Sequence, residues 1–232
     1  MQFVIPAPAI PSLPIVGSDA RFPIRRVYCV GRNYAAHARE MGGDPTREPP
    51  FFFSKPADAL QVVPAGETVD HPYPPRTQNY HFEIEMVAAL HRGGRDIPVE
   101  QALDHVFGYA VGLDMTRRDL QDDAKALRRP WELAKGADLS GPVGPLHPAA
   151  AIGHPGKGRI ALAVDGAVKQ QADLADMIWS VAEQVAYLSQ YFELQPGDVI
   201  FSGTPEGVGA VQRGQTMVGS IEGLGEISVR VV

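Results

Sequence analysis

Apolar and polar residues alternate along much of this chain with a period of two, which is typical of a β-strand buried on one face. The clearest case is the pentad Phe82-Glu83-Ile84-Glu85-Met86, in which the glutamates would point one way and the apolar side chains the other. The pattern therefore favours a β-rich α+β fold. Similar runs predict strands at 26–31, 59–63, 81–91, 105–113, 159–164, 167–171, 198–202 and 226–232.

Fewer segments carry the longer period of a helix. Apolar residues recur at helical spacing over 177–192, and shorter helices are expected at 35–41 and directly after Asp114. The pair Asp165-Gly166 separates two predicted strands and accepts the positive backbone dihedrals of a type I′ turn. Those two strands are therefore expected to form a hairpin.

The bulk properties bound the class of protein. The 232 residues can bury a core as one domain, which we place at 24–232, behind a proline-rich extended arm at 1–23 that lies on the surface or against a partner subunit. A net charge of −6, with both signs interspersed, argues against nucleic acid and membrane partners. The lone Cys29 lies in an apolar run and is expected to be buried, and no stretch resembles a secretion signal or a membrane span. A cytoplasmic protein that acts on small molecules is the expectation.

The glutamate pair and one aspartate are candidates for binding a metal. Two carboxylates on one strand face repel each other unless a cation or a shared proton lies between them. Glu83 and Glu85 thus suggest a hard divalent ion, Mg²⁺ or Mn²⁺ with Ca²⁺ as a further candidate, although an edge strand with a solvated acidic face has the same pattern. Asp114 follows an apolar, glycine-punctuated run, where it could cap the next helix or complete a three-carboxylate metal site.

Two further pairs of polar residues are spaced three apart in predicted helices. His37 and Glu40 would share one side of the first helix, where they either activate a water or form an exposed ion pair of little consequence. Arg118 and Gln121 would face one cavity together with Asp114 and offer a planar fork and a neutral donor to a carboxylate.

In these and other motifs the chain resembles the fumarylacetoacetate hydrolase family, in one order from about residue 25 to the C-terminus. The resemblance implies a mixed-sheet roll or barrel with few helices, assembled as a homodimer. The short single-domain form looks most like the acylpyruvate hydrolases of the family. The matching stretches are 31–40, the turn at 53–56, 81–85, 113–121, 130–135 and 203–209.

The resemblance also assigns roles. It implies that Glu83, Glu85 and Asp114 hold the divalent ion and that His37 and Glu40 are a water-activating dyad on a lid-like segment. Lys135 would be a catalytic lysine near the ion. His81, directly before the acidic pair, either touches the ion or packs behind it, and we expect it to pack behind. Residues expected to contact the substrate are Arg118, Gln121 and Thr204, with Arg32, Arg39 and Lys55 as candidates for its far carboxylate.

The implied activity is metal-dependent hydrolysis of the carbon–carbon bond of an acylpyruvate. The expected reaction converts fumarylpyruvate to fumarate and pyruvate, as in gentisate-type aromatic breakdown. The same site would also suit decarboxylation of oxaloacetate, or an isomerase or decarboxylase of 2-hydroxy-diene-dioates. A metabolite-binding scaffold without turnover is the alternative outside enzymes.

Overall fold

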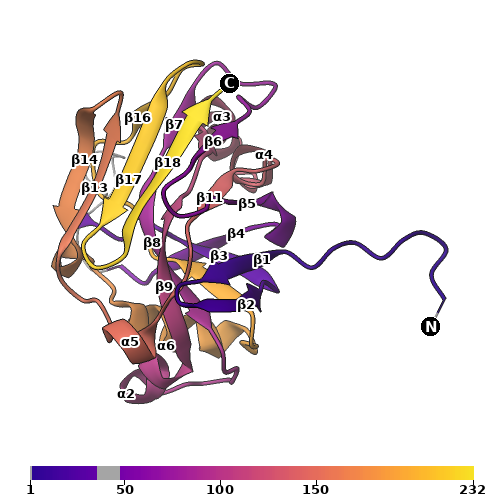
Figure 1. The fold of residues 1–232 in the computed structure, drawn as a ribbon, viewed down its shortest axis with the longest axis vertical. Helices are drawn as coiled ribbons and strands as arrows, with labels where there is room; N and C mark the ends of the chain where they lie inside the picture. Colours follow the sequence, from indigo (N-terminus) through magenta and orange to yellow (C-terminus); the bar gives the residue numbers. More distant parts are fainter. Residues whose placement is uncertain (1, 36–47) are drawn as a thin grey trace.

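A computed structural model describes residues 2–35 and 48–232. In this part of the chain, strands predominate, helices are short, and the strands form four sheets (Figure 1). The predicted β-rich α+β roll is therefore confirmed. The helix expected at 35–41 lies outside the described residues except for Ala35.

Eight strands of the described chain form the larger sheet. They are β3 (Arg26–Gly31), β4 (Phe51–Lys55), β5 (Leu60–Val62), β8 (Ile84–Leu90), β9 (Val106–Leu113), β11 (Gly141–Val143), β12 (His147–Pro148) and β15 (Asp198–Phe201). The order is β4-β3-β15-β8-β9-β11-β5, with β12 paired to β9. The sheet is mixed, because β15 is parallel to β3 while both neighbours of β8 are antiparallel to it. Strand β8 thus lies in the interior of the sheet, and all of its residues are buried.

A second sheet of five strands packs on one face of the first (Figure 1). In the order β14-β13-β17-β18-β6 it contains β6 (Thr68–His71), β13 (Arg159–Val164), β14 (Ala167–Asp173), β17 (Thr216–Ile221) and β18 (Gly225–Val231). Asp165 and Gly166 connect β13 to β14 with φ angles of 48° and 80°, and Val164 pairs with Ala167. The predicted two-residue hairpin turn is confirmed.

The main core lies between the two sheets. Met86 and Ala88 of β8 and Ile227 and Val229 of β18 belong to it, together with Val185 of helix α6 (Val181–Tyr191). Successive strand residues point to opposite faces of the sheet. Val87 and Ala89 of β8 therefore belong to a second core on the other face. Fully buried apolar side chains on both faces explain why β8 reads as a continuous hydrophobic run after Glu85.

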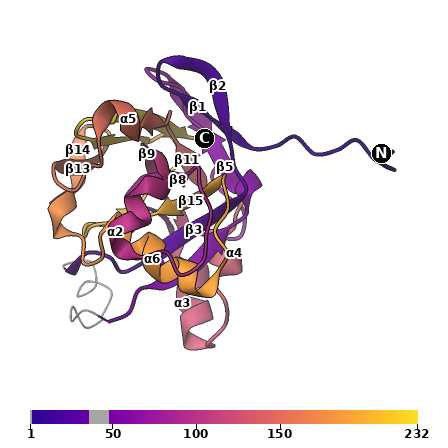
Figure 2. The ribbon, with the colours of Figure 1, turned by 90° about the horizontal axis from the view of Figure 1, so that it is seen from below.

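The second core is covered by the hairpin of β1 (Ser12–Ile15) and β2 (Ser18–Pro23). Leu13 and Phe22 of this hairpin pack on the face of the larger sheet that carries Val87 and Cys29. Cys29 is buried as expected, and burial raises the pKa of its thiol well above the ordinary value. The expected arm at 1–23 therefore includes this hairpin, while residues 2–11 leave the body at β1 and extend away from it in both views (Figures 1 and 2).

The helices of the described chain are α2 (Val99–Ala102), α3 (Arg118–Ala126), α4 (Glu132–Lys135), α5 (Ala149–Ile152) and α6. The helix expected over 177–192 is α6, and it begins later because Ser180 caps it. The Ser180 hydroxyl accepts the Glu183 N–H, and the Glu183 carboxylate accepts the Ser180 N–H, which is a capping box. None of these helices is long and apolar enough to cross a membrane.

Three expectations about local structure were wrong. The helix expected directly after Asp114 begins only at Arg118, because Thr116 and Arg117 form a short strand. Residues 53–55 are not a turn but part of β4, because this segment pairs with β3 along its whole length. The strand expected at 81–91 is interrupted at Glu83, which separates β7 (Tyr80–Phe82) from β8. Strand β7 pairs instead with β10 (Thr116–Arg117) and β16 (Gly209–Ala210) in a small third sheet. The other predicted strands begin and end within two residues of observed strands.

Candidate metal centre and its pocket

The interruption of the strand at Glu83 brings three carboxylates together. On β8 and β9, Glu85 is opposite Gly112, and the next backbone contact is a hydrogen bond of 2.8 Å from Asp114 N to Glu83 O. Asp114 thus lies beside the glutamate pair at the end of the ladder. One oxygen from each carboxylate lies within 4.8 Å of the others.

Burial distinguishes between the interpretations that the sequence left open. Glu83, Glu85 and Asp114 are 4%, 1% and 0% exposed, and β8 is an interior strand, so an edge strand with a solvated acidic face is excluded. The capping role of Asp114 is excluded as well, because α3 begins at Arg118 with Arg117 as its N-cap residue. Three buried carboxylates without partners would be prohibitively costly, so their charge has to be compensated.

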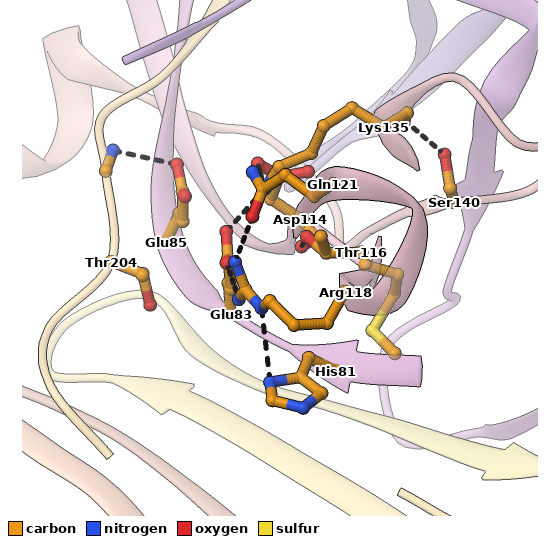
Figure 3. Close-up of polar contacts among 12 residues, drawn as sticks. His81, Glu83, Glu85, Asp114, Thr116, Arg118, Gln121, Lys135, Ser140 and Thr204 are labelled. Atoms are coloured by element: carbon orange, nitrogen blue, oxygen red, sulfur yellow. Dashed lines mark hydrogen bonds and ion pairs between the residues drawn. The ribbon is translucent and has the colours of Figure 1, made fainter. Parts of the chain in front are cut away.

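Three buried cations provide this compensation, and two of them, Arg118 and Lys135, are drawn in Figure 3. Lys135 Nζ lies 2.6 Å from Glu83 Oε2 and 2.8 Å from Asp114 Oδ2, and Arg118 Nη2 forms an ion pair with Glu83 Oε1. Lys55 Nζ lies 2.9 Å from Asp114 Oδ1. With all of these groups ionised, the formal charges of the three carboxylates and the three cations sum to zero.

The third carboxylate, Glu85, is the least compensated of the set. Its Oε2 accepts the Gly203 N–H at 2.7 Å. Burial raises its pKa well above the ordinary value, and the charges of Asp114 and Glu83 raise it further, while Lys135 and the Gly203 N–H oppose the shift. For Lys135, burial alone would lower the pKa, but Asp114 and Glu83 outweigh it and raise the pKa.

The donor set fits a hard divalent ion. Carboxylate oxygens are the ligands that Mg²⁺ and Mn²⁺ prefer, and an ion between them would remove the repulsion that raises the Glu85 pKa. Asp114 Oδ1 is buried and accepts no hydrogen bond within the described chain, although Lys55 lies at ion-pair distance. That oxygen therefore retains capacity for a ligand bond. The residues that would hold the ion are Glu83, Glu85 and Asp114.

A pocket opens directly above the carboxylates. Its empty volume is about 370 Å³, and Glu83, Glu85 and Thr204 are among its lining residues. The expected substrate contacts Arg118, Gln121, Thr204 and Arg32 line it together with Lys135. Other lining residues are Val30, Gly31, Phe51, Phe53, Glu83, Glu85, Lys125 and Trp131.

The loop that carries Thr204 is fixed by a buried glutamine. Gln170 Nε2 donates to Thr204 Oγ1 and to Pro205 O, each at 2.8 Å, and its Oε1 accepts the Ile84 N–H at 3.0 Å. Gln170 therefore connects the loop to the backbone between the two glutamates. Gly203, with φ of 96°, takes a backbone conformation that favours glycine, and an added Cβ would lie 2.5 Å from Asn33 Cβ.

Lys55 and His81 lie behind the pocket. Besides Asp114, the Lys55 ammonium reaches Met115 O at 3.1 Å and Ser140 Oγ at 3.0 Å, and its side chain is fully buried. Lys55 is thus held by protein groups at the base of the centre, away from the pocket lining. His81 Nδ1 accepts a 3.3 Å hydrogen bond from Arg118 Nε and so helps to orient the guanidinium (Figure 3).

Three expected site residues cannot be placed, and one pocket residue was not expected. His37, Glu40 and Arg39 lie outside the described residues. Lys125 was not predicted as a site residue, yet it lines the pocket from α3 together with Arg118 and Gln121. The signal was present in the sequence, because Lys125 is four residues after Gln121 and seven after Arg118, the spacing of one helical face. Fold and centre together define a β-roll protein with an acidic site for a divalent ion.

Comparison with known proteins agrees with this class. The family model "Fumarylacetoacetate (FAA) hydrolase C-terminal" matches residues 26–232. The chain therefore belongs to the fumarylacetoacetate hydrolase family, as its motifs predicted. It is 44% identical to the fumarylpyruvate hydrolase of a Ralstonia species over 81% of this chain and 95% of that protein. It is 40% identical to the mitochondrial oxaloacetate tautomerase of Arabidopsis thaliana over 89% of this chain and 90% of that protein.

A solved structure covers the whole length. The crystal structure of fumarylpyruvate hydrolase from Pseudomonas aeruginosa in complex with Mn²⁺ and pyruvate has 62% sequence identity to this chain and a TM-score of 0.98. The likeness covers 100% of this chain and 99% of that one.

Proposed function

We propose that this protein is a hydrolase that cleaves the carbon–carbon bond of an acylpyruvate, with fumarylpyruvate as substrate and fumarate and pyruvate as products. The observation that carries the proposal is the buried Glu83–Glu85–Asp114 centre at the base of a pocket lined by cationic and neutral donors. Two relatives at 44% and 62% identity are fumarylpyruvate hydrolases, and one of them is seen with Mn²⁺ and pyruvate. We place the reaction in aromatic breakdown on the same grounds.

The ion we propose is Mg²⁺ or Mn²⁺, held by the three carboxylates. When bound, it would supply a Lewis acid that accepts the oxygens of a 2-oxo acid and stabilises the negative charge that develops on the pyruvate half. The charges support this assignment. Because carboxylates and buried cations already balance, a divalent ion adds a positive surplus that an anionic substrate can neutralise.

The chain's own residues orient the substrate. Arg118 and Gln121 present donors on one face of α3, and Nη1 of Arg118 also donates to Gln121 Oε1 at 2.5 Å, which fixes both side chains. Thr204 lines the same pocket, and its hydroxyl, which accepts a hydrogen bond from Gln170 Nε2, can still donate its own proton. We propose that these groups bind the pyruvate carboxylate, and that Lys55 positions Asp114 rather than contacting the substrate.

Hydrolysis requires a base for water and an acid for carbon. We propose that His37 and Glu40 remove a proton from water, whose oxygen forms a bond to the acyl carbonyl carbon. The bond between that carbon and the methylene group of the pyruvate half then breaks, and the methylene carbon receives a proton. We propose that Lys135 gives this proton, because Asp114 and Glu83 raise the pKa of its ammonium and keep it protonated.

Steady-state assays of the Mn²⁺-loaded protein test the proposal. Fumarylpyruvate should be lost with equal formation of fumarate and pyruvate. Glu40→Gln should retain Mn²⁺ binding and lose most hydrolysis, because the dyad activates water and does not hold the ion. Full turnover by Glu40→Gln would refute the role of the dyad, and a wild type without activity on any acylpyruvate would refute the proposed function and favour a binding scaffold.

The second candidate is a reaction on oxaloacetate or a related oxo acid at the same centre. It is favoured by the 40% identity to an oxaloacetate tautomerase and would need no water-activating base. Decarboxylation or isomerisation should survive Glu40→Gln, whereas hydrolysis should not. Pyruvate formation from oxaloacetate detects decarboxylation, and the rate of its keto–enol interconversion detects tautomerisation; both are measured on the same sample beside fumarylpyruvate hydrolysis.

We also propose that the protein is a cytoplasmic homodimer. Phe3, Val4, Ile5 and Ile10 of the arm are 61%, 102%, 70% and 73% exposed, and the arm points away from its own body (Figure 1). An apolar segment of this kind is expected to pack on a second subunit. Sedimentation should show a dimer whose dissociation constant rises when residues 2–10 are removed, and a monomeric full-length protein would overturn this.

A further inference from the structure

We propose that Lys125 and Arg32 form a subsite, at the mouth of the pocket, for a second carboxylate at the far end of the acyl group. The inference rests on the proposed function, because it names the part of the protein that would select a dicarboxylic acylpyruvate. Neither an acyl group without a charge nor the pyruvate half would need this subsite.

Lys125 reaches the pocket from the last turn of α3. Its side chain is 29% exposed, and its ammonium lies 5.8 Å from the centre of the Trp131 ring. It lies 3.3 Å from Asp122 Oδ1, but the Asp122 side chain is 60% exposed, so this pair is screened by solvent. The aliphatic stem of Lys125 thus lies in the pocket wall while its charge stays available to a ligand.

Arg32 approaches the same mouth from the end of β3. Its φ of 57° is uncommon for a residue other than glycine, and its guanidinium carbon lies 5.7 Å from the centre of the Phe51 ring. Gly31 permits this packing, because a Cβ at that position would lie 2.1 Å from Phe51 Cζ. Within residues 2–35 and 48–232, no carboxylate pairs with Arg32.

Two cations that we assign to the subsite, Lys125 and Arg32, line the same pocket. Burial lowers the pKa of Lys125; Asp122 opposes this shift, while Arg118 and Arg32 add to it. Arg118 is already committed to Glu83 and Gln121. A carboxylate bound beside Lys125 and Arg32 would offset the repulsion between these two cations, which the solvent-screened Asp122 opposes at Lys125.

The walls of the mouth fit a planar acyl group. The Trp131 ring lies 5.5 Å from both Phe51 and Phe53, measured between ring centres. All three rings line the pocket that joins the metal centre to Lys125. An unsaturated, conjugated chain with a carboxylate at its end matches this combination of aromatic walls and terminal cations.

The test compares two substrates that undergo the same cleavage. Fumarylpyruvate carries the far carboxylate and acetylpyruvate does not. Lys125→Met retains the apolar stem against Trp131 and removes the charge, so KM for fumarylpyruvate should rise about tenfold to a hundredfold while acetylpyruvate kinetics stay unchanged. Arg32→Asn, which tolerates the left-handed backbone, should act in the same direction.

Two control variants accompany the test. Lys125→Arg keeps the positive charge, so its KM for fumarylpyruvate should stay close to that of the wild type. Lys157→Met removes an exposed lysine that does not line the pocket and should change the kinetics of neither substrate. An unchanged KM for fumarylpyruvate in Lys125→Met would overturn the subsite, and an equal loss with acetylpyruvate would mean that Lys125 only supports the structure.

A binding measurement separates this inference from the proposed function. If the wild type cleaves neither substrate, the proposed function fails, but fumarate can still be titrated into the Mn²⁺-loaded protein by calorimetry. Lys125→Met should then weaken fumarate binding about tenfold and leave pyruvate binding unchanged. Equal fumarate dissociation constants for wild type and variant would overturn the subsite.

Discussion

Replacing Lys55 by Met tests whether the metal centre depends on charge compensation from behind. The Lys55 ammonium is fully buried and lies 2.9 Å from Asp114 Oδ1, 3.0 Å from Ser140 Oγ and 2.5 Å from Lys135 O. Methionine has a similar shape but cannot donate a hydrogen bond. Lys55→Met therefore leaves the volume nearly unchanged and exposes Asp114 to an apolar neighbour.

The stability lost in Lys55→Met depends on which contacts of Asp114 and Lys135 remain. Asp114 keeps Lys135 at its other oxygen, and Lys135 O keeps the Ser140 hydroxyl, so the loss is concentrated at Asp114 Oδ1 and Met115 O. Removing one partner of a buried ion pair costs about 3–5 kcal/mol because the other charge stays buried. We expect a loss of about 3 kcal/mol in the free energy of unfolding of the metal-free protein.

Urea unfolding in EDTA measures this loss, and three comparisons interpret it. Lys157→Met should lie within about 0.5 kcal/mol of the wild type. The double variant Lys55→Met with Asp114→Asn should lose less than the sum of the single changes, because the unpaired charge is gone. Mn²⁺ at a hundredfold excess over its dissociation constant should restore about 2.7 kcal/mol. A cost below about 1 kcal/mol with additive single changes would refute the reasoning.

Three further predictions concern stability, the Thr204 loop and metal removal. His71 is held neutral between Gln61 and Tyr80, and burial lowers its pKa to about 4 from 6.5. The native state then binds fewer protons than the unfolded state, so the free energy of unfolding falls as the pH falls from 6.5 to 4. His71→Gln should remove up to about 3 kcal/mol of this pH dependence, which urea unfolding at several pH values measures. Gln170→Leu should release the loop that carries Thr204, raising the pyruvate dissociation constant of Mn²⁺-loaded protein in calorimetry while Mn²⁺ affinity changes little; unchanged pyruvate affinity would contradict the role of the glutamine. Chelation should lower the Tm in a thermal scan and added Mn²⁺ should restore it, since the ion binds only the folded state.

The pattern of polar and apolar residues was enough to predict the three carboxylates of the candidate metal centre. The alternation at Glu83 and Glu85 and the apolar run before Asp114 are local signals, and the structure joins them because β8 and β9 are neighbours. The start of α6 could also have been predicted, since Ser180 and Glu183 form a readable capping box. Lys125 could have been found from the helical spacing it shares with Gln121.

Other features depend on contacts that the sequence does not reveal. Lys55 was expected to contact the substrate, and its burial behind Asp114 could not be predicted because its partners Met115 and Ser140 are 60 and 85 residues away in the chain. Gln170 lies on a strand that alternates without a motif, yet its amide connects Ile84 to Thr204. The strand at 51–55 was missed because its pairing with β3, rather than its own pattern, makes it a strand. Long-range pairing of this kind becomes visible only in the fold.

The proposed chemistry depends most on one divalent ion bound by three acidic side chains. Crystals soaked in Mn²⁺ and measured at the manganese absorption edge locate the ion without reference to activity. We predict one anomalous peak per chain, about 2.2 Å from an oxygen of each of Glu83, Glu85 and Asp114. A fully soaked crystal without a peak among these carboxylates, or with manganese bound elsewhere on the chain, would contradict the account.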